Sequence, residues 1–151
     1  MKGKKLTILV NISILSNLHK IDELINLHND YSEFGLLIIA FPTMQFEDSL
    51  IKITNEQVIR FTEAIQAKFL MSEICDVNGS NSHPIFMQLR KRTPCFKFTV
   101  KGKIKNIPNN FCKFFIDSSG SVVHYQNQNN SLHAVVDEVE IILGLRGSKD
   151  K

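Results

Sequence analysis

Cysteine is scarce in this chain of 151 residues, and the few cysteines are far apart. There are three, at positions 75, 95 and 112, and their odd number and wide spacing match no disulfide framework and no metal-binding pattern. His124 and His133 are too scattered to complete a metal site, so no metal or other cofactor is expected. Free thiols are typical of a reducing compartment. The sequence therefore predicts a cytoplasmic protein.

The chain also lacks any apolar run approaching the roughly 18 residues that span a membrane. Basic residues in 1–5 followed by the apolar residues 6–10 have the order of a signal peptide. However, Asn11 and Ser13 interrupt the apolar run, and no cleavage site of small residues follows it. A buried strand is the better interpretation, and secretion is the alternative if residues 1–15 act as a signal sequence.

A dense basic stripe is missing as well. The net charge is +3, and the excess of Lys and Arg gathers at Lys2, Lys4, Lys5 and within residues 90–105. Proteins that bind nucleic acids usually carry a denser stripe with interleaved aromatic residues. We expect a solvated surface with one basic corner, and no nucleic-acid partner.

What the chain does contain is enough apolar residues, 43%, for one sizeable core. Residues 36–41 form an unalternating apolar run between Gly35 and Pro42, which is typical of a strand covered on both faces of a parallel sheet. Gly35 is predicted to end a helix, and Ser131 to begin one. The full predicted order is a strand at 6–10, a helix at 18–33, a strand at 36–41, helices at 55–68 and 84–90, a loop at 93–110, strands at 111–117 and 122–126, and a helix at 131–143. This β-α-β half followed by a β-β-α half predicts an α/β, thioredoxin-like fold, with a central mixed sheet and helices on both faces.

Residues 35–46, GLLIIAFPTMQF, resemble the signature GLxILAFPCNQF of the glutathione peroxidase family. Further matches keep the family's order: residues 9–13 resemble IVNVAS, residues 27–31 resemble LHxxY, residues 77–84 match VNGxxxHP, and residues 107–117 resemble IxWNFxKFLID. Each motif alone is weak, but together they extend from about residue 3 to residue 143. On these motifs the chain is identified as a member of the family, similar to its short phospholipid-hydroperoxide type.

The resemblance implies thiol-dependent reduction of hydroperoxides, with a hydroperoxide and either glutathione or thioredoxin as partners. In the family, a cysteine or selenocysteine after the first motif is oxidised by the peroxide and then restored by thiols. A Gln, a Trp and an Asn surround it and supply hydrogen-bond donors. The nucleophile must be soft and mostly ionised near neutral pH.

In this chain another residue occupies the position of the nucleophile. Counting forward from Asn11 places Ser16 there, and counting back from His28 places Ile14 there, because the segment is shorter than usual. A serine hydroxyl is not ionised near neutral pH and has no sulfenic-acid chemistry. Losing the nucleophile normally removes most of the rate advantage of such a site.

The supporting residues are only partly present. Gln45 and Asn110 match the family Gln and Asn, whereas Asn109 stands at the Trp position and Met44 at the Asn before the Gln. The resolving cysteine of thioredoxin-dependent members falls close to Thr62. The resemblance therefore implies a half-empty site made of Ser16 and the Gln and Asn residues named here.

Other departures concern the outline of the chain. We expect one domain over residues 1–144 and a tail at 145–151, without the N-terminal hairpin that precedes the first strand in the family. The segment 47–52 replaces the family's GxQEPG. The segment 92–105 is too short for the oligomerisation loop of tetrameric members, so a monomer is predicted.

Three functional hypotheses remain open. The first is residual thiol peroxidase activity through Cys95, whose basic neighbours would lower its pKa, although an incidental surface thiol is the simpler interpretation. The second is a non-enzymatic pseudo-peroxidase that binds a partner or ligand through Gln45, Asn110 or the basic loop. That loop carries four lysines, Lys97, Lys101, Lys103 and Lys105. The third is a degenerate copy with little function.

Overall fold

The computed structural model describes residues 3–48, 50–97 and 102–146. In chain order the elements are β1 (Leu6–Ile12), α1 (Leu18–Tyr31), the 3-10 helix η1 (Ser32–Phe34), β2 (Leu36–Pro42), α2 (Asn55–Ala64), β3 (Leu70–Met71), α3 (Pro84–Arg92), the 3-10 helix η2 (Pro94–Phe96), β4 (Lys113–Asp117), β5 (Val122–Gln126) and α4 (Leu132–Ile142). Within these described ranges, no helix is long and apolar enough to cross a bilayer.

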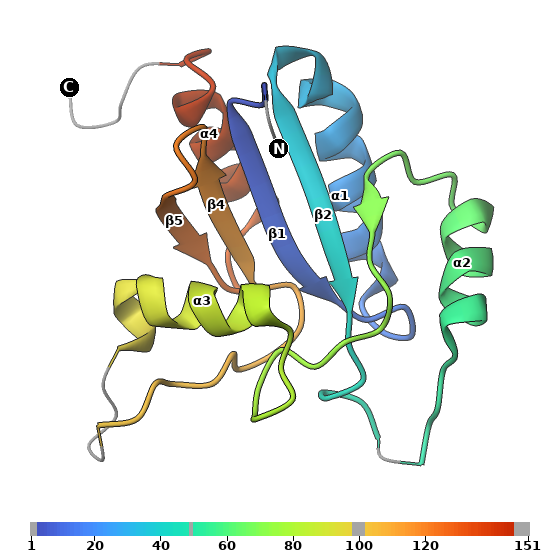
Figure 1. Cartoon of the computed structure of the whole chain (residues 1–151). Helices are drawn as coiled ribbons and strands as arrows, with labels where there is room; N and C mark the ends of the chain where they lie inside the picture. Colours follow the sequence, from blue (N-terminus) through green and yellow to red (C-terminus); the bar gives the residue numbers. More distant parts are fainter. Residues whose placement is uncertain (1–2, 49, 98–101, 147–151) are drawn as a thin grey trace.

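The strands form one sheet in the order β3-β2-β1-β4-β5 (Figure 1). β1 runs parallel to β2 from the pair Leu6–Leu36 to the pair Ile12–Pro42, and β2 runs parallel to β3. β4 is antiparallel to both β1 and β5. The apolar runs of β1 and β2 thus occupy the centre of the sheet, where both faces are covered. This arrangement confirms the predicted mixed sheet.

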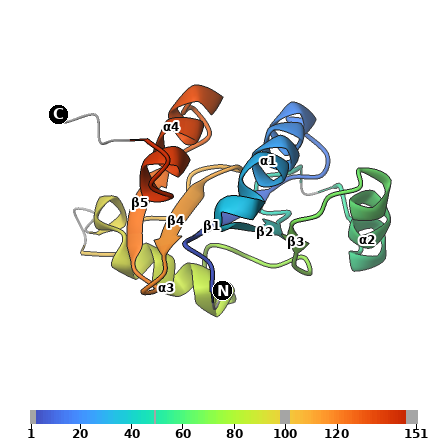
Figure 2. The same ribbon diagram turned by 90° about the horizontal axis from the view of Figure 1, so that it is seen from above.

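Helices cover both faces of the sheet, as predicted (Figure 2). α1 and α4 pack on one face over a cluster that includes Leu24, Ile38 and Val139. α3 packs on the other face, where Phe86 and Phe114 belong to a second cluster. The alternation of side chains along β1 and β4 supplies residues to both clusters, so the two cores share the central strands.

Two helix ends confirm predicted caps. Gly35 follows η1 and has a φ of 107°, which favours glycine, and a Cβ there would also lie only 3.0 Å from the Lys5 side chain. Ser131 precedes α4, and its hydroxyl accepts a hydrogen bond from the N–H of Ala134 at 3.1 Å.

Several boundaries differ from the predictions. α2 ends at Ala64 rather than near residue 68, and Gln66 then takes a φ of 54°. The short strand β3 lies where the sequence predicted only a mixed segment, because its pairing with β2 is a tertiary contact. β4 begins at Lys113 rather than at Phe111, which has a φ of 64°. A left-handed residue cannot continue the pleated strand.

The basic residues that the structure describes in this corner are mostly exposed, as predicted, but one of them is buried. Arg90 is only 8% exposed, and one of its guanidinium N–H groups donates to the Ser82 hydroxyl at 3.3 Å. Burial lowers the pKa of Arg90. Lys91, Arg92 and Lys97 are solvent-exposed or nearly so, whereas Lys2, Lys101 and tail residues 147–151 lie outside the described residues.

Candidate functional site

The candidate site residues all belong to loops at one edge of the sheet (Figure 1). The parallel strands β1 and β2 end at this edge, and the antiparallel β4 begins there. Ser16 follows β1, Gln45 follows β2, and Asn109 and Asn110 precede β4. Carboxyl ends of parallel strands are the usual place for a ligand in open α/β sheets. The topology therefore brings the four residues to one edge, as the family resemblance requires.

Ser16 lies on the exposed turn before α1. Its hydroxyl lies 3.2 Å from the Ser13 hydroxyl and 3.5 Å from the Glu47 carboxylate and can donate to one of the two at a time, and its N–H donates to the Ser13 hydroxyl at 3.1 Å. Ile14, the other residue at the nucleophile position by counting, is partly buried and packs against the core. A carboxylate beside Ser16 would oppose the ionisation of any group at this position.

Gln45 is tied to the turn that precedes α3. Its side-chain N–H donates to the carbonyl of Asn78 at 2.9 Å, and its side-chain oxygen accepts from the N–H groups of Val77 at 2.7 Å and Asn78 at 3.0 Å. The Asn78 side chain in turn exchanges two hydrogen bonds with the backbone of Ile107. Gln45 and Asn78 therefore fasten three loops together, and one N–H of the Gln45 amide donates to a backbone carbonyl.

Asn109 and Asn110 differ in their surroundings. Asn110 is 6% exposed, and its side-chain oxygen is buried with no hydrogen-bond partner among the described residues. Asn109 lies 3.3 Å from the Cys112 sulfur through both its backbone and side-chain oxygens. No hydrogen bond joins Ser16 to Gln45, Asn109 or Asn110 in the part of the chain that the structure describes.

Asn11 is a site residue to which the motif comparison gave no role. It is fully buried in β1, its side-chain N–H donates to the Asn109 carbonyl at 2.9 Å, and its side-chain oxygen accepts from the N–H of Cys112 at 3.2 Å. Its own carbonyl accepts from the N–H of Phe111 at 2.6 Å. Asn11 thereby holds the left-handed turn at Phe111. The sequence carries a signal for this role, because Asn11 continues an apolar strand and a buried polar side chain needs hydrogen-bond partners.

The three thiols all lie where burial opposes their ionisation. Burial raises the pKa of Cys75 to about 11 and also raises the pKa of Cys112, whose side chain is fully buried. Cys95 is exposed as a residue, yet partial burial of its thiol raises its pKa and outweighs the opposite effect of Lys105. A basic neighbour thus acts on Cys95 in the expected direction, but it does not set the net direction of the pKa shift. A thiol with a raised pKa is mostly protonated near neutral pH and a poor nucleophile.

Lys113 is a buried cation at the same edge of the sheet. It is 6% exposed, and its ammonium group donates to the Phe111 carbonyl at 3.1 Å. Burial, followed by repulsion from Lys20, lowers the pKa of Lys113 to about 8, against a smaller opposing attraction from Glu23. The folded state therefore binds a proton here less tightly than the unfolded chain does.

Replacing Lys113 by methionine should stabilise the protein by about 1–2 kcal/mol near pH 7, after allowing for the lost hydrogen bond. Because the folded pKa is about 8 and the unfolded pKa is 10.5, the unfolded chain binds more protons between these values. The wild type should therefore gain stability as the pH rises through this window, and the advantage of Lys113→Met should shrink.

Urea unfolding near pH 7 and near pH 10 measures this difference, with the exposed Lys91→Met as a matched control. If Lys113→Met raises the free energy of unfolding by the same amount at both pH values, burial of the ammonium group is not the cause of that increase.

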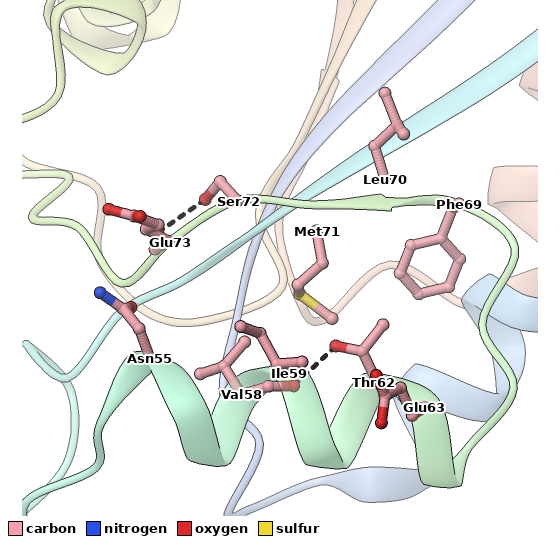
Figure 3. Close-up of a pocket in the computed structure, with 10 residues that line it drawn as sticks. All are labelled: Asn55, Val58, Ile59, Thr62, Glu63, Phe69, Leu70, Met71, Ser72 and Glu73. Carbon is pink, nitrogen blue, oxygen red and sulfur yellow. Dashed lines mark hydrogen bonds between the residues drawn. The ribbon is translucent and has the colours of Figure 1, made fainter.

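One hollow lies beside the loop that follows β2, and another lies beside α2. One, of about 410 Å3, is lined by Met44 and Gln45 together with Asp48, Lys52 and Asp76, among others, and neither Ser16 nor Asn110 lines it. The other, of about 450 Å3, lies between α2 and β3 and is lined by Thr62 but by none of the four candidate site residues (Figure 3). Among the described residues, no group of three or more His, Cys, Asp or Glu could hold a metal ion.

Comparison with known proteins agrees with the motifs. The sequence matches the glutathione peroxidase family over residues 1–90. It is 39% identical over 102 residues to a phospholipid hydroperoxide glutathione peroxidase of Callithrix jacchus, covering 67% of this chain and 49% of the relative. It is 32% identical over 148 residues to a protein named as a probable phospholipid hydroperoxide glutathione peroxidase of Mesembryanthemum crystallinum, covering 95% of this chain and 81% of the relative.

Solved structures support the fold. The crystal structure of T. cruzi GPX1 superposes with a TM-score of 0.68 at 24% identity, covering 95% of this chain and 84% of that chain. A thioredoxin-like superfamily protein superposes with a TM-score of 0.64 at 14% identity, covering 93% and 80%. The chain spans about half the length of the mammalian relatives that it matches. It belongs to the glutathione peroxidase family, on a thioredoxin-like fold.

Proposed function

We propose that this chain is a glutathione peroxidase family member that does not turn over hydroperoxides and instead acts as a non-catalytic binding module. The observation that carries the proposal is the pairing of Ser16 with Glu47 at the position of the family nucleophile. Neither side chain can be oxidised by a peroxide and then reduced by a thiol.

Two further features support the proposal. All three thiols of the chain have raised pKa values, so none is poised for attack on a peroxide. One N–H of the Gln45 amide is engaged by the Asn78 carbonyl, and its oxygen by two backbone N–H groups, so this side chain is fixed on the turn before α3 and makes no hydrogen bond to Ser16.

The names of the relatives point to phospholipid hydroperoxides as the substrate class and to glutathione as reductant, and the family resemblance adds thioredoxin as the alternative reductant. Under this proposal such molecules would be bound weakly or not at all, and none would be reduced. As part of the same proposal the chain is a monomer, since the segment 92–105 is short, and it is cytoplasmic, an inference supported by its three free cysteines.

Peroxide consumption by the purified full chain tests the proposal. Hydrogen peroxide and a phospholipid hydroperoxide are each supplied with glutathione or with thioredoxin. We expect a rate no higher than that of Cys95→Ser, the variant that lacks the exposed thiol, and no change after alkylation with iodoacetamide. Turnover well above this control, abolished by alkylation, would establish thiol peroxidase activity through Cys95 and reject the proposal.

A further inference from the structure

The hollow between α2 and β3 has apolar walls. Its volume is about 450 Å3, and Val58 and Ile59 of α2 face Phe69 and Met71 across it. Figure 3 shows Phe69 and Met71 pointing toward α2, whereas Leu70 points away from it. We call this hollow the β3–α2 slot. Its size and apolar walls are those of a binding cavity.

Three polar side-chain groups around the slot, the hydroxyls of Thr62 and Ser72 and the amide oxygen of Asn55, already have hydrogen-bond partners within the chain. The hydrogen bonds run from the Thr62 hydroxyl to the Val58 carbonyl, from the Ser72 hydroxyl to the Glu73 carbonyl, and from the Ile74 N–H to the Asn55 side-chain oxygen, each at 2.8 Å. A small polar molecule would therefore find little to orient it. The slot instead suits apolar side chains, which need no such partners.

The charged side chains of the slot are both acidic. Glu63 belongs to the last turn of α2 and Glu73 follows β3, and both are exposed (Figure 3). Carboxylates repel the headgroup of a fatty acid or of an anionic phospholipid, and they attract Lys and Arg. Charge therefore favours a basic peptide over a lipid as the occupant.

The backbone beside the slot is open to pairing. β3 is the last strand of the sheet and pairs only with β2, so alternate backbone groups of β3 face away from the sheet. α2 is loosely packed as well, because Val58 is its only buried residue and Ile59 is 58% exposed. A lightly packed helix beside an edge strand leaves room for one more extended segment.

We propose that the β3–α2 slot docks an extended segment of a partner protein, which pairs with the open edge of β3. The segment alternates apolar side chains, which enter the slot, with Lys or Arg, which meet Glu63 and Glu73. This inference deepens the binding role proposed above and rests on it. The peroxide assay does not depend on peptide binding. If the docking proposal fails, the proposal that the chain does not turn over hydroperoxides still stands on that assay.

A random-peptide phage library selected on the immobilised full chain tests the docking site. Enriched peptides are synthesised with a fluorescent label, and their dissociation constants are measured by anisotropy. We expect alternating apolar and basic sequences that bind Ile59→Glu at least about tenfold more weakly than wild type, since a charge then enters the apolar contact. The matched control Leu132→Glu, an exposed apolar residue of α4, should bind as the wild type does.

Two further measurements decide the mode of binding. The double variant Glu63→Lys and Glu73→Lys should weaken the binding of basic peptides and reverse the dependence of their affinity on salt, because salt then screens a repulsion. Hydrogen exchange at residues 70–72 should slow when peptide binds, because strand pairing protects amides. The proposal is overturned if no enriched peptide depends on Ile59, if acidic peptides or a fluorescent fatty acid fill the slot instead, or if bound peptide leaves exchange at β3 unchanged.

Discussion

A Ser16→Cys variant is expected to react with hydrogen peroxide no faster than an ordinary exposed thiol, despite carrying the family nucleophile. The start of α1 would favour a thiolate, but the Glu47 carboxylate lies 3.5 Å from the Ser16 hydroxyl and opposes it. Gln45 is held by the turn at Asn78, to which one of its amide N–H groups donates, and it makes no hydrogen bond to Ser16. We therefore expect a thiol at position 16 to lack the activation that the family nucleophile receives.

Removing the opposing charge should restore part of the reactivity. The double variant Ser16→Cys with Glu47→Gln should lower the pKa of the new thiol by about one unit, because a like charge at this distance costs about 1 kcal/mol or more. The rate of thiol oxidation should rise several-fold. Stopped-flow kinetics and the pH dependence of alkylation measure both effects.

The matched control is Ser118→Cys, an exposed residue of the turn between β4 and β5. Ser16→Cys alone should match it in rate. If instead Ser16→Cys outpaces Ser118→Cys by orders of magnitude, the pocket is intact and only the nucleophile was lost. Equal rates with and without Glu47→Gln would show that the carboxylate does not control this position.

Asn11→Ala is expected to lower the free energy of unfolding by about 2–4 kcal/mol, the largest loss of stability that we predict for the site. The change deletes both hydrogen bonds of the Asn11 side chain and leaves the buried Cys112 N–H without its acceptor, whereas the Asn109 carbonyl keeps its contact with the Cys112 thiol. It also removes a support of the turn at Phe111, whose φ of 64° costs about 1–3 kcal/mol that the surrounding contacts must offset.

Urea unfolding measures the loss, with the exposed Asn81→Ala as a control that should fall within about 0.5 kcal/mol of wild type. A second readout is local: Cys112 should be alkylated faster in Asn11→Ala, because the turn that covers it opens more often. A small loss of stability with unchanged alkylation would show that Asn11 does not hold this turn.

Much of the fold could be predicted from the sequence because its signals are local. The apolar runs of β1 and β2, the cap at Ser131 and the turn at Gly35 each depend on neighbours within a few residues. The family motifs added the order of the elements and the loops that meet at one edge of the sheet. Ser16 at the nucleophile position could likewise be found by counting.

Only the tertiary structure decided which hydrogen bonds and contacts the side chains make at the edge of the sheet that carries the candidate site. The direction of the Gln45 amide, the contact between Ser16 and Glu47 and the role of Asn11 all depend on segments distant in sequence. The net direction of the Cys95 pKa shift also needed the structure, because basic neighbours are visible in a sequence and burial is not. Local patterns determine which elements form. Burial and long-range hydrogen bonds determine what their side chains can do, since both arise only when distant segments pack together.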